Sequence, residues 1–382
     1  MSDKSPLFSV YVIDGVPCDA TPAELLEECM PDKRKCACEK ERPEIVDESL
    51  DPPPTSFVYE SENPVGYVDA VTGALGVERP FRMLYPETFT RERIAAALLS
   101  AIWREGHFRL DNLEMELLWK WNVRKLGNMA SFYNSVSSAS DYLFSLGVRI
   151  SGYGFEETGE ACFLKASAAL PPHKEGEPES DDELLVEMPF ESARPWIGEG
   201  MKCPSKAVKD NDSWLIYIPF DTCGHKLGGS LLAEVSGHNG GVGPVIGDPD
   251  YFIDCYEIVR EFVEDGIVMS GVTVCDGGLM AALASLCSDC SVVADVNGIA
   301  TAYNEPDATK ILYSEIPGVL MQIQDSDYDY IDAQLLLQDV AYYPIGHPDH
   351  SGKGISVVRE SRAGVASILA SLMQGQLSEG ED

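Results

Sequence analysis

Two glycine-rich turns are the features of this sequence whose residue types and spacing could do chemistry. The first reads LGGS at residues 227–230 and the second reads CDGGL at residues 275–279. Each leads into a short run of helix-forming residues, and a longer helical segment over 250–265 lies between them. Glycine permits a tight turn into a helix, and the unpaired backbone N–H groups at a helix start bind anions such as phosphate. The candidate anion-binding residues are therefore Gly228, Gly229, Ser230, Asp276, Gly277 and Gly278.

A third glycine-containing segment, GHPDHSGKG at residues 346–354, is a weaker candidate for phosphate binding. Five residues instead of four separate Gly346 from Gly352, and Gly354 stands where a phosphate loop has the Ser or Thr that contacts magnesium. His347 and His350 in the same segment permit metal binding, but this spacing beside a proline is more typical of a polar loop. We therefore expect this segment to be structural.

Four cysteines and a further histidine are of residue types that can bind a metal ion. Cys36 and Cys38, together with Cys287 and Cys290, could supply the four thiolates of a zinc site. The second pair, however, falls at the end of the helix that follows CDGGL, where buried structural thiols are common. His225, beside the first glycine turn, is expected to be a partly exposed turn residue. No metal site is therefore predicted.

Composition limits the classes of function. The 382 residues are 45% hydrophobic, which is enough for two domains with apolar cores. A formal net charge of −35 repels nucleic acid and anionic membranes, so neither is expected as a partner. The sequence contains no long apolar segment and no signal peptide pattern. Eleven cysteines in such a chain are typical of reduced thiols, which predicts a cytoplasmic, reducing compartment.

Charge and periodicity divide the chain into five parts. Residues 1–56 are an N-terminal extension with a strand at 8–13, a helix at 22–29 and an acidic linker at 31–54; residues 57–170 form a first domain; residues 171–212 are an acidic connector; residues 213–350 form a second domain; residues 351–382 are a helix over 355–372 and an acidic tail. In the first domain we expect strands at 57–59, 113–121, 148–150 and 161–166, with helices at 90–104, capped by Thr90, and at 130–145. In the second we expect strands at 214–218, 291–295, 310–313 and 319–324, and helices after both glycine turns, at 250–265 and at 329–337.

The order of these motifs resembles the last synthetase module of formylglycinamide ribonucleotide amidotransferase (FGAM synthase), in the superfamily that includes aminoimidazole ribonucleotide synthase. In the second domain, LGGSLLAEV, CDGGLMAALASLC and SEIPGVL at 314–320 carry the resemblance. In the first, it rests on GVERP at 76–80, AALLS at 96–100, LDNLEMELLWKW at 110–121, FYNSV at 132–136 and GYGFE at 152–156. It covers roughly residues 57–350, and residues 8–36 look like the end of the preceding module. It implies a two-domain α/β (α+β) fold, with an N-terminal ferredoxin-like, barrel-forming sheet domain and a C-terminal α/β sandwich.

The departures from the family pattern fall on its polar residues. The Glu and Asn of the family motif EALTN, which hold a magnesium ion, become Ala96 and Ser100. The Lys, Asp and Ser of the turn GGKDS become Gly154, Phe155 and Glu156, and HDxSDGGL loses its His and first Asp to Val272 and Thr273 and its Ser to Cys275. The strand carrying RTVGGL and DQxVGP has no counterpart. Asp276 alone does not hold magnesium, which takes about six oxygen ligands.

The sequence therefore predicts a homologue that has kept the fold and lost catalysis. We expect no cofactor, with ATP and magnesium as the alternative. The predicted function is a non-enzymatic structural or regulatory subunit; the alternative is one half of a split FGAM synthase, favoured by the retained Gly228, Gly229, Ser230 and Asp276. The family buries the first-domain sheet against a second copy of the module. We therefore expect a protein partner or a homodimer through the first domain.

Overall fold

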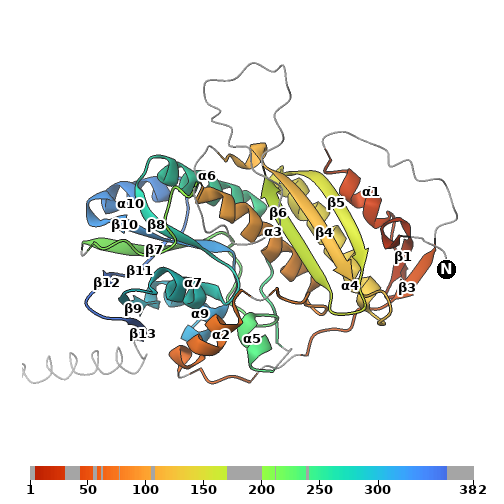
Figure 1. Ribbon diagram of the computed structural model, residues 1–382, viewed down its shortest axis with the longest axis horizontal. Helices are drawn as coiled ribbons and strands as arrows, with labels where there is room; N and C mark the ends of the chain where they lie inside the picture. The colour runs from red at the N-terminus through yellow and green to blue at the C-terminus, as the bar shows by residue number, and fades with distance from the viewer. Residues whose placement is uncertain are drawn as a thin grey trace, which may run out of the picture.

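Four small sheets, with the helices that pack on them, make up the described part of this mixed α/β chain (Figure 1). The computed structural model describes residues 5–30, 44–54, 58–61, 63–76, 78–104, 108–169, 200–210, 212–237 and 241–358. The N-terminal segment contains a 3-10 helix, η1 (Pro6–Phe8), then β1 (Val10–Ile13), β2 (Val16–Pro17), α1 (Pro22–Glu27) and β3 (Ile45–Glu48). Strand β3 pairs parallel with β1. Part of the predicted linker at 31–54 is thus a strand.

A three-stranded sheet of order β5-β4-β6 follows, with α3 and α4 packed against it. Its region contains η2 (Pro64–Tyr67), α2 (Val68–Ala74), α3 (Pro86–Ile102), η3 (Leu110–Asn112), β4 (Glu114–Trp121), α4 (Asn128–Leu146), β5 (Arg149–Glu157) and β6 (Phe163–Ala169). Buried and half-buried residues alternate strictly along β4, as its sequence predicts. Trp119 and Trp121 face the helices and donate indole N–H groups to Ser135 Oγ at 2.9 Å and Asn128 O at 2.8 Å.

The opposite face of this sheet is polar rather than apolar. Leu118 of β4 lies between Gly154 of β5 and Lys165 of β6, and Lys120 pairs with Glu156 at 3.3 Å. The large apolar side chains of β4 are already covered by the chain's own helices. They therefore give no reason of their own for a partner on this sheet.

The C-terminal region is built on a four-stranded sheet of order β11-β7-β10-β8. Its elements are β7 (Ser213–Pro219), α5 (Leu231–Val235), α6 (Pro249–Glu264), β8 (Val268–Val274), α7 (Gly278–Leu286), β9 (Ser291–Asp295), α8 (Asn297–Ala302), α9 (Ala308–Tyr313), β10 (Gly318–Gln324), η4 (Asp325–Asp327), α10 (Tyr328–Leu337), β11 (Tyr343–Gly346), β12 (Pro348–Asp349) and β13 (Gly354–Val358). Strands β12, β9 and β13 form the fourth sheet.

Helices cover both faces of the four-stranded sheet. Figure 1 shows α6 and α10 on one side and α7 and α9 on the other. Along β7, Ile216 and Ile218 join the apolar cluster that contains α6 residues, whereas Leu215 and Tyr217 join the cluster that contains α7 residues. Burial on both faces explains the apolar runs of β7 and β10, and Gln322, the buried polar residue of β10, is hydrogen-bonded to Ser213 and Ser270. No helix among the described residues is long and apolar enough to cross a membrane.

Several predicted elements are wrong in type or boundary. Residues 310–313 belong to helix α9, because Asp307 caps that helix by accepting from Thr309 N at 2.9 Å. Helix α3 begins at Pro86 rather than at Thr90, and Thr90 is buried inside it. Residues 58–59 form no strand, and residues 152–156 continue β5 instead of turning.

The chain-end and connector predictions need similar correction. Residues 355–358 belong to strand β13 rather than to a helix, and the rest of the predicted tail helix lies outside the described residues. Most of the acidic connector, 171–199, also lies outside them. Its end packs on the protein instead of spanning a gap, because Cys203 is buried and Pro204 O accepts from Gly271 N at 3.0 Å. Strand β8, which receives this contact, was not predicted.

Candidate functional site

The two glycine turns lie where the sequence places them, at the starts of α5 and α7. Ser230 caps α5 by accepting from Ala233 N at 3.2 Å. Gly277 and Gly278 open α7 with φ angles of +75° and +65°, a conformation that glycine adopts without strain. A side chain on Gly228 would meet Gly241 O at 2.3 Å, so that glycine is required by a close backbone approach. The glycines thus have structural reasons to be present.

The two turns converge on one carboxylate of the chain itself. Glu315 Oε1 accepts from Leu231 N and from Gly277 N, both at 2.7 Å. These N–H groups belong to the first turn of α5 and the cap of α7, where the sequence predicts an anion site. Glu315 is 2% exposed. The anion that these amides bind in this structure is therefore the Glu315 carboxylate.

Two arginines contact this carboxylate, and a third joins them through Asp276. Arg79 pairs with Glu315 at 3.3 Å, with the more exposed Glu234 at 3.1 Å, and with Asp276. Arg82 pairs with Glu92 at 3.1 Å and also with Glu315, while Arg93 pairs with Asp276. We call this set the arginine–carboxylate cluster; its members are Arg79, Arg82, Arg93, Glu92, Asp276 and Glu315. Asp276, the one retained acidic residue of the second turn, is thus engaged by two guanidinium groups.

The cluster sets the protonation of its acids. Burial alone would raise the pKa of Asp276, but Arg93 and Arg79 outweigh it and hold that pKa well below its usual range. Burial likewise acts against the charge of Glu315, and Arg79 and Arg82 lower its pKa below the ordinary value. For Glu92 the balance is reversed, because its complete burial raises the pKa to about 8 although Arg82 acts in the opposite direction. Two of the three carboxylates are therefore firmly ionised at neutral pH.

The cluster leaves few hydrogen-bonding groups for another ligand, and those few are buried. Among the described residues, the Nε groups of Arg79, Arg82 and Arg93 are buried without a hydrogen-bond partner. The terminal nitrogens of these guanidinium groups carry the ion pairs. An external anion would therefore have to displace Glu315 or Asp276 to gain a comparable set of partners.

The positions that correspond to the family's metal ligands and phosphate contacts have internal partners. Ser100 Oγ donates to Ala97 O of its own helix at 2.7 Å. Thr273 Oγ1 accepts from the indole N–H of Trp103 at 3.0 Å, and that indole lies so close to β8 that a side chain on Gly271 would meet it at 2.2 Å. Phe155 packs on Phe132 with ring centroids 5.1 Å apart. The space between the end of α3 and strand β8 is thus filled by Trp103.

His225 is buried, contrary to the expectation of a partly exposed turn residue. It is 2% exposed, and its ring lies edge-on to Tyr303 with centroids 4.7 Å apart. Neither ring nitrogen has a hydrogen-bond partner among the described residues. Burial lowers the pKa of His225 to about 4, so the ring is neutral at physiological pH.

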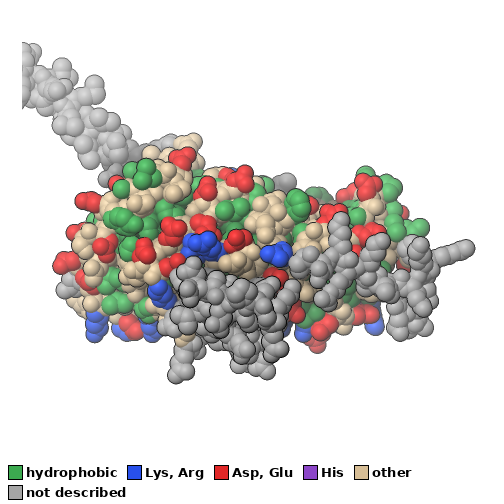
Figure 2. Space-filling view, turned by 90° about the horizontal axis from the view of Figure 1, so that it is seen from above, with side chains coloured by type: hydrophobic (Ala, Val, Ile, Leu, Met, Phe, Trp, Pro, Cys, Tyr) green, Lys and Arg blue, Asp and Glu red, His purple; other side chains and the backbone are tan. Residues whose placement is uncertain are grey.

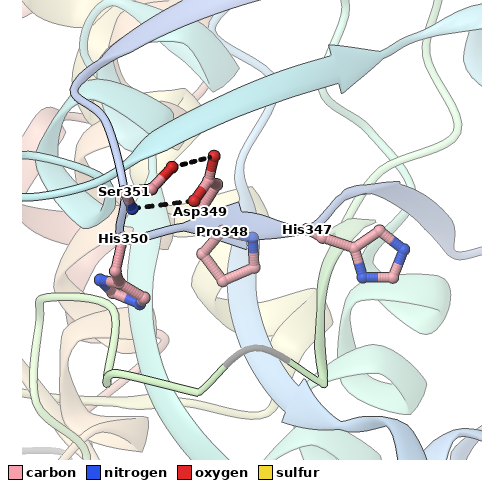
Figure 3. A pocket seen from close by; sticks show the side chains of 5 residues that line it. All are labelled: His347, Pro348, Asp349, His350 and Ser351. Atoms are coloured by element: carbon pink, nitrogen blue, oxygen red, sulfur yellow. Dashed lines mark hydrogen bonds between the residues drawn. The ribbon is translucent and has the colours of Figure 1, made fainter.

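A surface pocket lies over the segment that is similar to a phosphate loop. Its volume is about 660 Å³, and it is lined by His347, Pro348, Asp349, His350 and Ser351. His347 Nδ1 contacts Ser213 O at 2.9 Å and His350 Nε2 contacts Val208 O at 3.1 Å, while Asp349 accepts from Ser351. The two imidazole rings lie apart, on either side of Pro348 (Figure 3). The lining residues therefore do not converge on a ligand.

The proposed zinc ligands are only partly within the described structure. Cys287 and Cys290 are buried free thiols at and just beyond the end of α7. Cys36 and Cys38 lie outside the described residues. Within the part of the chain that the structure describes, no three His, Cys, Asp or Glu side chains are grouped so as to hold a metal ion.

Sequence reasoning missed most of the cluster. Arg79 and Glu315 both lie in segments that carry the resemblance, GVERP and SEIPGVL, but neither is among the predicted site residues. Glu92 is buried on the apolar side of α3, and a charged residue at such a position was the available signal.

Comparison with known proteins finds distant sequence relatives. No protein-family model matches it. It is 24% identical over 285 residues to the probable chloroplastic/mitochondrial phosphoribosylformylglycinamidine synthase of Arabidopsis thaliana, covering 74% of this chain and 19% of the relative. The human phosphoribosylformylglycinamidine synthase is 24% identical over 281 residues, covering 73% and 20%. Probable membrane antigen 3 of Saimiriine herpesvirus 2 is 26% identical over 152 residues, covering 39% and 12%.

Two solved structures align with the chain at low sequence identity. Phosphoribosylformylglycinamidine synthase II of Thermotoga maritima aligns with a TM-score of 0.49 at 13% identity, covering 74% of this chain and 41% of that chain. The hydrogenase maturation protein HypE of E. coli aligns with a TM-score of 0.46 at 10% identity, covering 88% and 92%.

The mixed α/β chain therefore falls in the class of synthetase-region homologues. It is a distant homologue of phosphoribosylformylglycinamidine synthase, that is, FGAM synthase. It spans about a fifth of the length of the two synthases it matches.

Proposed function

We propose that this chain is a non-catalytic homologue of the FGAM synthase synthetase module that serves as a structural or regulatory subunit of a larger assembly. In this proposal the fold is the family's two-domain arrangement, with a ferredoxin-like sheet domain at β4–β6 and an α/β sandwich around β7–β11. Catalysis is absent in this proposal because the groups that would bind nucleotide and metal are bonded to other residues of the same chain.

The observation that carries the proposal is the occupation of both glycine turns by Glu315. Its carboxylate accepts from Leu231 N and Gly277 N at 2.7 Å and is held by the buried Arg79 and the half-buried Arg82. A nucleotide phosphate approaching these amides would meet a negative charge that is already paired. Displacing a buried, hydrogen-bonded carboxylate leaves it uncompensated, at a cost of about 3–5 kcal/mol.

The region of the missing metal supports the same proposal. Magnesium needs several oxygen ligands in octahedral geometry. Ala96 supplies none, Ser100 Oγ is bonded to its own helix, and Thr273 Oγ1 is bonded to Trp103. The indole lies directly against Gly271 of β8, two residues before Thr273.

The second candidate function is one half of a split FGAM synthase. It is favoured by the extent of the match, which covers most of this chain but about a fifth of each synthase, and by the retained Asp276. In that case the other half and a glutaminase would come from other chains. Asp276 would then have to release Arg79 and Arg93 before it could bind a metal.

An activity assay separates the two functions. The purified chain is incubated with formylglycinamide ribonucleotide, Mg-ATP and ammonia, with and without the first synthetase half of a family enzyme, and ADP release is measured. We expect no ADP above the rate of the enzyme half alone. Turnover that needs this chain and is abolished by Asp276→Asn would establish the split enzyme instead.

A further inference from the structure

Helix α10 exposes an apolar stripe on the side that faces away from the core. Ile331 and Leu335 are completely buried and hold the helix on the protein. On the other side, Tyr330, Ala333 and Leu337 follow one another at i, i+3 and i+7 and so share one face, with Leu336 beside them. Tyr330 is 47% exposed, Leu336 66% and Leu337 78%. The helix therefore has a second apolar face that nothing described in this chain covers.

This concentration of exposed side chains differs from the rest of the surface. Val16, Leu126 and Phe144 are also exposed but lie on separate segments, and the exposed pair Val242 and Val245 lies in a loop rather than on one face of a helix. Single exposed apolar residues are normal on soluble proteins, whereas a contiguous patch marks an interaction site. The stripe also reaches the neighbouring helix, because the Tyr330 ring lies 6.4 Å from that of Phe262 on α6.

The rim of the stripe is strongly acidic. The only basic residue of α6, η4 and α10 is Arg260, which is buried and paired with Glu257, Glu261 and Glu264. Lys202 reaches the end of α6, where it donates to Glu264 O. Figure 2, which looks down on the side where α6 and α10 lie in Figure 1, shows Asp and Glu side chains among hydrophobic ones. The carboxylates of these elements are Asp250, Asp254, Glu257, Glu261, Glu264, Asp325, Asp327, Asp329 and Asp332.

We propose that the exposed stripe of α10, with the adjoining side of α6, is a docking surface for a basic amphipathic helix of a partner protein. The apolar face of such a helix packs on Tyr330, Leu336 and Leu337, and its lysines and arginines meet the acidic rim. Helices with apolar residues at this spacing dock into apolar faces of other helices. Opposite charge at the rim favours encounter and excludes acidic competitors.

Charge favours a basic helix of a partner protein over two other candidate occupants, a second copy of the chain and its own residues 359–382. A second copy of the chain would bring the same carboxylates to a two-fold interface, where each faces its own kind. The chain's own residues 359–382 contain two arginines against four acidic residues, so their charge does not complement the rim. The docking surface uses no residue of the arginine–carboxylate cluster, so its test is independent of the non-catalytic function proposed above.

The experiment measures binding of a labelled synthetic helix to the full chain by fluorescence anisotropy. The probe is a peptide of roughly 18 residues with leucines at i, i+3, i+4 and i+7 and lysines elsewhere, and its control carries glutamates in place of the lysines. We expect the lysine peptide to bind, the glutamate peptide not to bind, and the affinity to fall as salt is raised. Replacing both Leu336 and Leu337 by Ser should weaken binding about tenfold or more, because central apolar anchors carry most of the affinity.

Matched variants distinguish binding at the stripe from general electrostatic attraction of a basic peptide to an acidic protein. Asp329→Lys, on α10, should weaken binding several-fold. Asp141→Lys, at an exposed position of α4, and Leu126→Ser, at another exposed leucine, should leave binding unchanged. All these residues are exposed, so unchanged thermal melts will show that the fold is intact. The proposal is overturned if the Leu336/Leu337 variant binds as well as the unaltered chain. It is also overturned if sedimentation shows a dimer that the same variant dissociates, or if removing residues 359–382 is what first permits binding.

Discussion

Replacing Glu315 by Ala should convert a filled anion site into an empty one. The change removes the acceptor of two backbone N–H groups, each at 2.7 Å, and the counter-charge of Arg79 and Arg82. Hydrogen bonds to a charged group contribute about 1.5–3 kcal/mol each, but part of that gain offsets the burial of the carboxylate. Breaking a buried ion pair from one side costs about 3–5 kcal/mol. We expect a loss of that size in the free energy of unfolding.

The same variant should regain stability from an external anion. Inorganic phosphate at about 100 times its dissociation constant adds about 2.7 kcal/mol to a folded state that binds it, which would restore more than half of the loss. The unaltered chain, whose amides already hold Glu315, should gain nothing comparable. Urea unfolding of both proteins, with and without phosphate, measures these differences.

Two controls define the outcome. Glu315→Gln keeps an acceptor oxygen but not the charge, so its stability should lie between those of the Ala variant and the unaltered chain. Glu160→Ala, at an exposed residue, should change stability little. The reasoning is refuted if Glu315→Ala is as stable as Glu160→Ala, or if phosphate stabilises the unaltered chain as much as the variant.

Three further predictions concern single residues. Burial raises the pKa of Glu92 to about 8, so the stability that its protonated form contributes is fully present below the unfolded value of 4.5 and is lost as pH rises through 8. Glu92→Gln should flatten the dependence of the urea midpoint on pH between 4.5 and about 8. His225 has a lowered pKa of about 4, so stability should fall as pH drops from 6.5 towards 4, and His225→Phe should remove that fall in thermal melts measured across this range. Gly277→Val should reduce the free energy of unfolding by more than about 1 kcal/mol, because the residue has φ +75° and a side chain would meet Val71 Cγ1 at 2.6 Å; a melt equal to that of the unaltered chain would contradict this.

Local patterns predicted much of the fold. The alternation in β4 and the continuous apolar runs of β7 and β10 follow directly from which faces of a strand are buried. The run at 310–313 was ambiguous, since a short apolar segment fits a buried strand or a buried helix. Asp307, three residues before this segment, is the N-cap of a helix, so the segment is helical.

The sequence located the two glycine turns of the candidate site, but it could not predict which side chains lie between them. The glycine turns identified the helix starts, yet Glu315 lies 84 residues from Leu231 and 38 from Gly277. No spacing rule connects residues so far apart. Asp276 pairs with Arg79 and Arg93, so Asp276→Asn should cause a measurable loss of stability even without a bound metal. His225 was predicted to be a partly exposed turn residue; its burial could not be predicted, because Tyr303, whose ring packs on it, is distant in sequence.

The central claim is that the chain's own carboxylate and indole occupy the sites where the synthetase module would bind nucleotide and metal. Titration calorimetry of the purified chain with millimolar Mg-ATP, together with a thermal melt in the same buffer, tests it most directly. We predict no binding heat and no shift of the melting temperature. Saturable binding with a shift of several degrees, which about 2.7 kcal/mol of ligand stabilisation would produce, would contradict it.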